Sequence, residues 1–337
     1  MVAMPTVLIC DDSATMRMAL KRTLLLGGLA VLGEAATGEE AVALAKQLRP
    51  DLITMDVMLP DLDGFQATQA ILSHGPARIV IVSAAGEALQ ADLSFRALQC
   101  GALDLVEKPE AGDAGLQAWG GALAAKLLAL AALPIGERPQ ASFRSPRPHL
   151  GERKINAFAI AVSTGGPPAL ARLLKGLPPT QGYPVRVAQH IAPGFTGGLA
   201  NWLGTQTALK VRMAEGGETA SPGTVWLARD RTDMTLHDGG RLRIVPNAGG
   251  VCPNGDRLLE SVATRLGKAS AGAVLTGMGA DGAKGLLAMK QAGALTFAQD
   301  AGSCVVDGMP AAAVAQGGAD TRLTLEELGF VMAELGR

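Results

Sequence analysis

The chain has 337 residues, of which 48% are hydrophobic and only 3% aromatic, and its formal net charge is -1. This length is too great for one ordinary hydrophobic core, and it predicts about two domains. The near-neutral charge leaves no strong positive field to attract a polyanion, so we expect no nucleic-acid partner.

The cysteines and the apolar segments indicate a soluble protein of a reducing compartment. The four cysteines lie far apart and form no Cys-x-x-Cys or Cys/His cluster, which argues against a zinc site and against a disulfide framework. The first residues, "MVAMPTVLICDDS", lack the basic region of a signal peptide. The apolar stretch at 122–133 is too short to span a bilayer and carries a lysine. We therefore expect a cytoplasmic protein with no direct membrane insertion.

Five short β-type runs alternate with helical periods in the first part of the chain. They are residues 6–10, 29–35, 51–56, 78–83 and 103–109. Strands separated by helices predict an open, doubly wound parallel sheet of the α/β class. A long apolar segment at roughly 114–133 supplies a closing helix. Residues 1–133 are therefore predicted to form a flavodoxin-like (βα)5 domain.

A stretch rich in proline and arginine, residues 134–154, reads as a linker to a second domain at 155–337. Further β-type runs follow at 155–163, 185–190, 224–229, 271–277 and 294–300. Between them "MTLHDGGRLRIV" predicts a β-hairpin, because Asp-Gly favours the left-handed turn that joins two such strands. The second domain is therefore predicted to be a larger, doubly wound α/β/α structure of three layers that contains a hairpin.

Polar side chains follow several of the predicted strands in the first domain. They are Asp11, Asp12, Asp56, Ser83 and Lys108. Because the carboxyl ends of parallel strands meet at one edge of a sheet, we expect these side chains to lie close together. Three neighbouring carboxylates repel one another unless a hard cation lies among them, and Mg²⁺ prefers such oxygen ligands. The sequence therefore predicts a magnesium site and phosphoryl chemistry.

In this interpretation Asp56 accepts a phosphoryl group, while Lys108 and Ser83 bind the new charge. The alternative, a set of solvated strand-end caps, explains any one of these residues more easily than all of them together. The motifs "DDSATMR", "MDVMLPDLDG", "VSA" and "EKP" closely resemble those of response-regulator receiver domains. The resemblance implies that Asp56 is the phosphoacceptor and that Asp11 and Asp12 help to bind magnesium. Leu105 departs from the family, which usually has an aromatic residue there that reports phosphorylation.

The stretch "AVSTGGPP", residues 161–168, places Ser163 between a β-type run and a turn in which proline favours the start of a helix. Backbone N–H groups at a helix start bind a phosphate or stabilise an oxyanion. This stretch alone is therefore compatible with an anion cradle or with a nucleophilic serine.

His190 is the histidine best placed to activate this serine. A serine hydroxyl is a poor nucleophile until a base takes its proton, and imidazole is the usual base near neutral pH. The remaining histidines lie in the first domain, the linker and the hairpin turn, and are His74, His149 and His237. His190 ends the strand that follows Ser163, so both are expected at one edge of the sheet. Asp281, in the glycine-rich "VLTGMGADGAKG", is the candidate carboxylate that orients the imidazole.

The chain order Ser, His, Asp separates this arrangement from an α/β-hydrolase, in which the acid precedes the histidine and glycine stands two residues before the serine. Two alternatives to a hydrolase are a response regulator whose second domain only binds a partner, and a phosphate-binding domain built on "STGGPP". A missing triad residue or a basic recognition helix would favour the former, and neither is seen. The P-loop pattern that would support the latter is absent.

The motifs "STGGP", "QHIAPGFTGGLA", "LTGMGADGAKG" and "CVVDGMP" closely resemble the catalytic domain of the chemotaxis protein-glutamate methylesterases, and the whole chain matches their architecture. The resemblance implies that Ser163 is the nucleophile, His190 the base and Asp281 its orienting acid. Backbone N–H groups near Thr164 and Met278 would form the oxyanion hole.

The same resemblance implies a function in bacterial chemotaxis. The family hydrolyses glutamate γ-methyl esters on chemoreceptors to glutamate and methanol, and many members also deamidate receptor glutamines. Hydrolysis needs no cofactor, and Mg²⁺ serves the receiver domain. The partners would be methyl-accepting chemoreceptors as substrates and a chemotaxis histidine kinase as phosphodonor. Phosphorylation of Asp56 would relieve occlusion of the catalytic cleft by the receiver.

Three segments depart from the family pattern. Ala161 and Val162 replace the usual Gly-Ala before the serine, and "CPNGD" replaces a Pro-Ser-Val-Asp segment. "LARDRTDM" stands where the family tends to read Ala-Pro-Gly followed by a histidine and a methionine. None of these changes removes a triad residue, and we expect the segments to lie around the substrate mouth.

Overall fold

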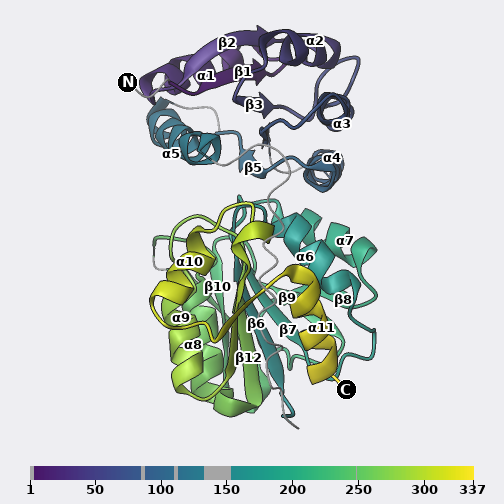
Figure 1. The fold of residues 1–337 in the computed structure, drawn as a ribbon, viewed down its shortest axis with the longest axis vertical. Helices are drawn as coiled ribbons and strands as arrows, with labels where there is room; N and C mark the ends of the chain where they lie inside the picture. The colour runs from purple at the N-terminus through teal and green to yellow at the C-terminus, as the bar shows by residue number, and fades with distance from the viewer. Residues whose placement is uncertain (1–3, 85–87, 110–112, 133–152, 248) are drawn as a thin grey trace. The chain divides into compact units, whose positions relative to one another are not determined.

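The structure is a computed structural model that describes residues 4–84, 88–109, 113–132, 153–247 and 249–337. The linker expected at 134–154 lies almost entirely outside the described residues. Internal contacts divide the chain into two compact units, Met1–Arg138 and Pro139–Arg337, each of which is described by itself (Figure 1). Along the described part of the chain, no helix combines the length and the apolar character that crossing a membrane requires.

The first unit is a five-stranded parallel sheet with the strand order β2-β1-β3-β4-β5. Its elements are β1 (Thr6–Cys10), α1 (Ala14–Leu26), β2 (Ala30–Ala35), α2 (Gly38–Leu48), β3 (Leu52–Met55), α3 (Gly64–Ser73), β4 (Ile79–Ser83), α4 (Ala88–Cys100), β5 (Asp104–Glu107) and α5 (Asp113–Ala131). The strands β1, β3 and β4 are almost wholly buried, which is why each reads as an apolar run. The predicted (βα)5 arrangement is confirmed.

Polar caps begin three of the helices in this unit. The side chains of Ser13, Thr37 and Asp63 each accept the backbone N–H three residues further on, at the starts of α1, α2 and α3. Because α1 starts directly after β1 at a fixed cap, the intervening residues Asp11 and Asp12 are held at the carboxyl edge of the sheet.

The second unit is a seven-stranded, all-parallel sheet with the order β14-β13-β12-β6-β7-β9-β8. Its strands are β6 (Ala157–Val162), β7 (Val185–Gln189), β8 (Lys210–Met213), β9 (Thr224–Leu227), β12 (Ser270–Val274), β13 (Leu295–Gln299) and β14 (Thr321–Leu323). Its α-helices are α6 (Gly166–Lys175), α7 (Thr196–Gln206), α8 (Gly255–Leu266), α9 (Ala283–Gln291), α10 (Gly308–Ala315) and α11 (Leu325–Leu335). The fold is of the predicted α/β class.

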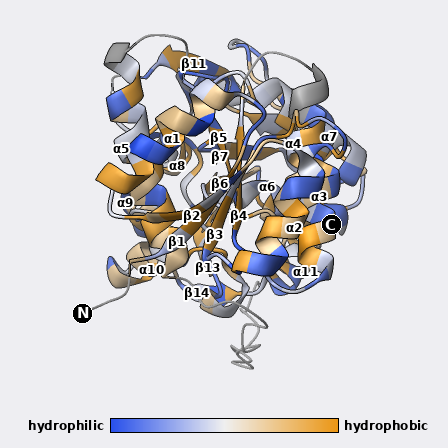
Figure 2. Ribbon diagram, turned by 90° about the horizontal axis from the view of Figure 1, so that it is seen from above, coloured by the Kyte–Doolittle hydropathy of each residue, from blue (hydrophilic) through white to orange (hydrophobic). Residues whose placement is uncertain are grey.

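Helices cover both faces of this sheet. The helices α8, α9 and α10 lie along one face and α6, α7 and α11 along the other (Figure 1). Hydrophobic residues run along the strands, whereas the helices carry both hydrophobic and hydrophilic residues (Figure 2). This pattern is expected of a sheet that is buried on both faces, and it gives the three layers that the sequence predicts.

The predicted hairpin is present as β10 (Thr232–Leu236) and β11 (Leu242–Pro246), which pair antiparallel. The turn uses Gly239 and Gly240, both with positive φ, as the "DGG" sequence indicates. Buried side chains of the hairpin share a hydrophobic core with α8. The hairpin is thereby fixed against that helix.

Two strands of the sheet, β8 and β14, were not expected from the sequence. The strand β8 is only four residues long and partly exposed, and β14 is only three residues long. Both occupy edges of the sheet, where short strands with charged residues such as Lys210 and Arg322 avoid pairing with other chains. They lack the apolar runs by which the buried strands are recognised.

The central strand β6 has β7 on one side and β12 on the other. The chain passes from β6 to β7 in one direction and reaches β12 only after a long excursion to the far side of β6. Ligands bind to open α/β sheets at the carboxyl ends of strands where the order reverses in this way. The loops after β6, β7 and β12 are therefore the favoured place for a site.

Candidate functional site

The turn after β6 holds Ser163 in place. Its backbone N–H donates to the carbonyl of Thr276, with N···O 2.9 Å, and the turn passes through Gly165 in a left-handed conformation into α6. A Cβ atom at Gly165 would lie 2.4 Å from the side chain of Val305, so only glycine fits this close approach. Ser163 itself is partly exposed at the sheet edge, as the sequence predicts.

His190 lies at the neighbouring strand end. Its backbone N–H donates to the carbonyl of Val162 at 2.9 Å. The side-chain amide of Gln189 donates to the carbonyls of Ser163 and His190, at 2.9 Å each. Gln189 therefore ties the serine loop to the histidine loop. This role could not be predicted from the sequence, because the "QHIAPGFTGGLA" motif that Gln189 begins does not show which backbone groups its amide contacts.

His190 and Asp281 form a direct hydrogen bond, with 2.7 Å between Nε2 and Oδ2. The side chains of His190 and Asp281 are 13% and 7% exposed, so this pair is shielded from water. Because the carboxylate accepts from Nε2, the other ring nitrogen, Nδ1, is left for a reacting group. Among the described residues, the structure shows no hydrogen bond between Ser163 Oγ and His190. Catalytic hydrogen bonds often form only when substrate is bound.

The carboxylate of Asp281 also accepts two backbone N–H groups from the first turn of α8. Gly255 donates to Oδ2 at 2.6 Å, and Asp256 donates to Oδ1 at 3.0 Å. Burial raises the pKa of Asp281, but the hydrogen bonds from His190 and from these N–H groups outweigh it and hold the pKa below its usual value. The acid is therefore ionised at neutral pH beside the histidine.

The loop after β12 lies beside the serine turn. A Cβ atom at Gly277 would be 2.6 Å from Ser163 Cβ, so the backbone before Met278 approaches the serine closely. Thr276 Oγ1 donates to the carbonyl of Thr164 at 2.9 Å, which links the two loops directly. Thr164 and Met278, the two predicted oxyanion positions, are thus held on segments that flank Ser163.

The "CVVDGMP" segment is attached to the same place by another buried amide. Gln299 Oε1 accepts the N–H of Thr276 at 2.8 Å, and its Nε2 donates to the carbonyl of Ser303 at 2.9 Å. Val306 N–H donates to Thr276 Oγ1 at 2.9 Å, and Gly277 N–H to the carbonyl of Val306 at 2.9 Å. This network fixes the backbone around Ser163 through uncharged side chains.

The predicted acidic site of the first unit is assembled at the carboxyl edge of its sheet. Asp11, Asp12 and Asp56 each offer an oxygen within 4.8 Å of the others. Lys108 Nζ lies 2.7 Å from Asp11 Oδ2 and 2.6 Å from Asp56 Oδ2. Ser83 is buried at the end of β4, where its carbonyl accepts the backbone N–H of Lys108 at 2.8 Å.

The electrostatics of this site suit a divalent cation. Burial raises the pKa of Asp11 even though Lys108 lies beside it. Burial also opposes the charge on Lys108, but Asp56 and Asp11 outweigh it and raise the pKa of Lys108, so the ammonium stays charged. The single ammonium pairs with two of the three carboxylates, and the converging oxygens of all three are the donor set that Mg²⁺ prefers.

Two known protein families match most of this chain. Residues 158–332 match the model described as "CheB methylesterase", and residues 7–119 match "Response regulator receiver domain". The chain belongs to the CheB methylesterase family. Within that family it carries an N-terminal receiver domain, which confirms the resemblance drawn from its motifs.

Curated relatives of the CheB methylesterase family match nearly the whole chain. A protein of Myxococcus xanthus named protein-glutamate methylesterase/protein-glutamine glutaminase 3 is 46% identical over 310 residues, covering 91% of this chain and 87% of its own. A similarly named protein of Anaeromyxobacter dehalogenans is 38% identical and covers 98% of this chain and 97% of its own. The crystal structure of the Thermotoga maritima CheB methylesterase catalytic domain superposes with a TM-score of 0.51 at 33% identity, covering 54% of this chain and 99% of that one.

Two of the segments that we expect to depart from the family pattern meet in space. A Cβ atom at Gly255, in "CPNGD", would lie 2.6 Å from Ala161 Cβ, and one at Gly282 would lie 2.7 Å from it. The methyl group of Ala161 therefore occupies space that a larger residue at 255 would need. Glycine at position 255, at the start of α8 and next to Asp281, leaves room for this methyl group.

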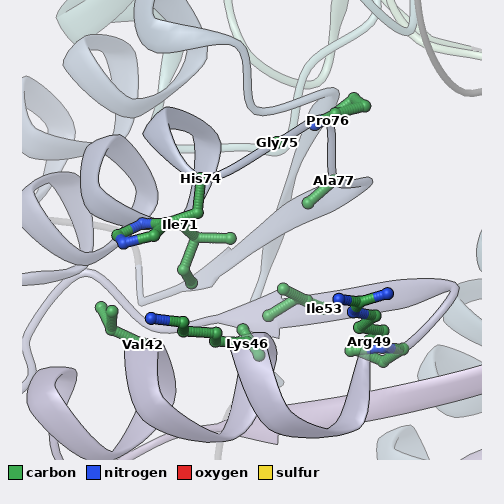
Figure 3. A pocket seen from close by; sticks show the side chains of 11 residues that line it. Val42, Lys46, Arg49, Ile53, Ile71, His74, Gly75, Pro76 and Ala77 are labelled. Atoms are coloured by element: carbon green, nitrogen blue, oxygen red, sulfur yellow. The ribbon is translucent and has the colours of Figure 1, made fainter.

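A separate hollow of about 400 Å³ lies between α2 and α3 of the receiver. Figure 3 shows Lys46 and Arg49 on one side of it and His74 on the other. Its floor includes Ile53, which is near the amino end of β3, whereas Asp56 follows the carboxyl end of the same strand. The hollow is therefore at the opposite edge of the sheet from the acidic site, and it is not part of that site.

Proposed function

We propose that this chain is a phosphorylation-controlled protein-glutamate methylesterase of bacterial chemotaxis that works by a Ser-His-Asp mechanism. The observation that carries the proposal is the shielded His190–Asp281 pair, which lies on the loops that follow the two strands on either side of β6, the strand that precedes Ser163. Ester hydrolysis through an acyl-enzyme needs a nucleophile, a base and an orienting acid that lie close together, here on neighbouring loops at one edge of the sheet.

In the first half of the reaction, Ser163 Oγ attacks the γ-carbonyl carbon of a methylated glutamate. His190 takes the serine proton at Nδ1, since Nε2 is already bound by Asp281. The ionised Asp281 stabilises the imidazolium that forms. The carbonyl oxygen becomes an oxyanion, for which the backbone N–H groups at Thr164 and Met278 are the assigned donors. The intermediate collapses when the C–O bond breaks, and methanol leaves with the proton from His190.

In the second half, a water molecule attacks the acyl-enzyme carbonyl and gives its proton to His190. The bond to Ser163 breaks, the serine oxygen regains a proton from the imidazolium, and glutamate is released. A glutamine side chain follows the same route with ammonia in place of methanol, so deamidation of receptor glutamines belongs to the same proposal. None of these steps requires a metal or an organic cofactor.

The receiver domain is proposed to control the rate of ester hydrolysis. Asp11, Asp12 and Asp56 would hold Mg²⁺, which neutralises phosphoryl oxygens when it is bound. Asp56 is the proposed acceptor of the phosphoryl group, and the ammonium of Lys108 lies close enough to pair with the added charge. Ser83, at the end of the next strand, is assigned to the same phosphoryl oxygens. The proposed partners are a chemotaxis histidine kinase as donor and methyl-accepting chemoreceptors as substrates.

We propose that the protein works in the cytoplasm. The four cysteines are free thiols in the structure, as expected in a reducing compartment. Both proposed partners act on that side of the membrane.

Labelling with a fluorophosphonate probe, which reacts with activated serines, tests the nucleophile. We expect the full-length protein to be labelled at Ser163 and the Ser163→Ala variant to remain unlabelled. Ser221→Ala is a matched control, because Ser221 is exposed on a loop and only its hydroxyl contact to Thr224 is lost. Absence of labelling in the wild type, or labelling that persists in Ser163→Ala, would contradict the proposal.

A further inference from the structure

A second buried carboxylate, Asp233, supports the start of α8. It lies on β10 with a fully buried side chain, where an uncompensated charge would be costly. Its Oδ2 accepts a bond of 2.6 Å from Arg257 Nη1. Its Oδ1 accepts the backbone N–H of Asn254 at 2.8 Å and Nδ2 of Asn247 at 2.9 Å. The carboxylate is therefore fully engaged, and its contacts fix its position.

Two of these three donors belong to the beginning of α8. Asn254 is the N-cap of the helix, and its side chain accepts the N–H of Arg257 at 2.8 Å. Asp233 thus holds both the cap and the residue that the cap itself binds. The contact ties the first turn of α8 to the hairpin strand β10.

The next two N–H groups along the same turn are those that bind Asp281. Asn254 donates to Asp233, whereas Gly255 and Asp256 donate to Asp281. Three successive backbone donors are therefore divided between two carboxylates, one of which orients His190. Any displacement of the turn away from Asp233 changes the geometry of the bonds to Asp281.

We propose that Asp233, paired with Arg257, is a positioning residue for the hydrolytic reaction that acts through the first turn of α8. It does not contact the reacting atoms. It sets where the N–H groups of Gly255 and Asp256 stand, and so how firmly the Asp281 carboxylate is held toward His190. The inference rests on the proposed function and extends it to a residue in "LARDRTDM", one of the segments that depart from the family pattern.

The variants Asp233→Asn and Arg257→Met test this role. Asp233→Asn keeps the shape and one acceptor oxygen but places an amide against Arg257, and Arg257→Met leaves the acid buried without its cation. In each variant we expect a weaker hydrogen bond between Asp281 and His190, which stabilises the imidazolium form of His190 less than in the wild type. We expect kcat for methanol release to fall about tenfold with KM unchanged. We also expect the acid limb of the kcat/KM profile to move roughly half a pH unit toward lower pH.

Arg265→Met is the matched control. Arg265 also lies on α8 and pairs with an exposed hairpin acid, Asp238, but at the opposite end of the helix. The substitution removes one arginine and one ion pair between the hairpin and α8, and it leaves the first turn of α8 unchanged. The other charged groups near that turn, Asp256, Glu260 and Lys284, are kept in every variant. Arg265→Met is expected to keep the wild-type profile.

Arg257→Lys serves as the conservative variant, and it is expected to recover most of kcat and the position of the acid limb, since it restores a cation to Asp233. Thermal unfolding of each full-length variant shows which of them are folded at the assay temperature. An acid limb that stays at the wild-type pH in a folded Asp233→Asn or Arg257→Met variant would overturn the inference. So would an equal shift in Arg265→Met. Failure of the proposed function itself is distinguished by the wild type, which would then release no methanol.

Discussion

Asp256 and Asp281 each accept a backbone N–H from the start of the other's helix. Asp281, just before α9, accepts the N–H of Asp256 in the first turn of α8 at 3.0 Å. Asp256 Oδ1 accepts the N–H of Gly285 in the first turn of α9 at 2.8 Å. The two helices are locked together by this exchange at the position where Asp281 meets His190. The acid of the proposed triad is thus held by backbone groups of α8, which is itself tied to α9 through Asp256.

Asp281→Asn is expected to lower kcat for methanol release by about 10³ to 10⁴ while the fold persists, because an amide favours the wrong tautomer of His190. Asp256→Asn is the comparison. Its amide oxygen still accepts the N–H of Gly285, and burial raises the pKa of the acid that it replaces. We expect this second variant to keep at least about a tenth of wild-type kcat. Equal losses in the two variants would contradict the assignment of Asp281.

The lowered pKa of Asp281 predicts a dependence of stability on pH. The folded protein binds the proton of Asp281 more weakly than the unfolded chain does, so ionisation of this acid stabilises the fold at pH values above its unfolded pKa. That contribution is lost as the pH falls through the lower pKa of the folded state. Urea unfolding of wild type and Asp281→Asn between neutral pH and about pH 3 measures it. Their difference in unfolding free energy is expected to shrink toward acid, and a constant difference would refute the assignment.

We expect substitutions at Ala161 and Gly255 to have non-additive effects on the free energy of unfolding. A Cβ atom at 255 would lie 2.6 Å from Ala161 Cβ, so Gly255→Ala overpacks this contact and should cost about 1–3 kcal/mol of unfolding free energy. Ala161→Gly removes the opposing methyl group, and in the double variant we expect part of that loss to be recovered, because Asp281 Oδ2 would still lie 2.9 Å from the new Cβ atom. A double-mutant cycle by urea unfolding gives the coupling directly. Additive effects of the two changes would show that the residues do not compete for this space.

Arg186 on β7 is a buried cation that the proposed mechanism does not use. Burial lowers its pKa to about 10, and two of its guanidinium nitrogens, Nε and Nη1, have no hydrogen-bond partner in the described part of the chain. Replacing a buried charge that lacks full compensation by an apolar side chain is often stabilising, so Arg186→Met is expected to raise the unfolding free energy by about 1–2 kcal/mol. Arg212→Met, at an exposed position on β8, should change it little. A loss of stability in Arg186→Met would show that the guanidinium is compensated.

Removal of magnesium should abolish the effect of phosphorylation and leave the hydrolytic reaction itself intact. We expect EDTA to abolish the stimulation of methanol release by a small phosphodonor such as acetyl phosphate, because Asp11 and Asp12 then lack the cation that phosphorylation of Asp56 requires. The unstimulated rate should stay unchanged, because the Ser163 reaction needs no metal. Restoring Mg²⁺ in excess is the control. A fall in the unstimulated rate with EDTA would place a metal in the hydrolytic site.

Much of the framework could be predicted from the sequence because it depends on local patterns. Buried parallel strands are continuous apolar runs, and the residue after each run lies at the carboxyl edge of its sheet. That rule alone predicted that Asp56 and Lys108 lie at one edge of the first sheet and that His190 lies at the same edge of the second sheet as Ser163. The pairing of His190 with Asp281 followed from the chemistry of imidazole and from the glycine-rich turn.

The supporting groups could not be predicted in this way, since they depend on contacts between segments that are distant in the chain. The N–H groups of Gly255 and Asp256 reach Asp281 only because α8 packs beside α9. Gln189 begins a motif and Gln299 lies outside any, but neither position shows that its side-chain amide binds the backbone of a neighbouring loop. The edge strands β8 and β14 were missed because they are short and charged rather than apolar.

Methanol release from methylated chemoreceptor membranes tests the central claim most directly. The full-length wild type, Ser163→Ala and Asp56→Asn are compared with and without acetyl phosphate and Mg²⁺. The account predicts that the phosphodonor stimulates the wild type, that Asp56→Asn keeps only the unstimulated rate, and that Ser163→Ala releases no methanol in either condition. Equal release by wild type and Ser163→Ala would contradict it.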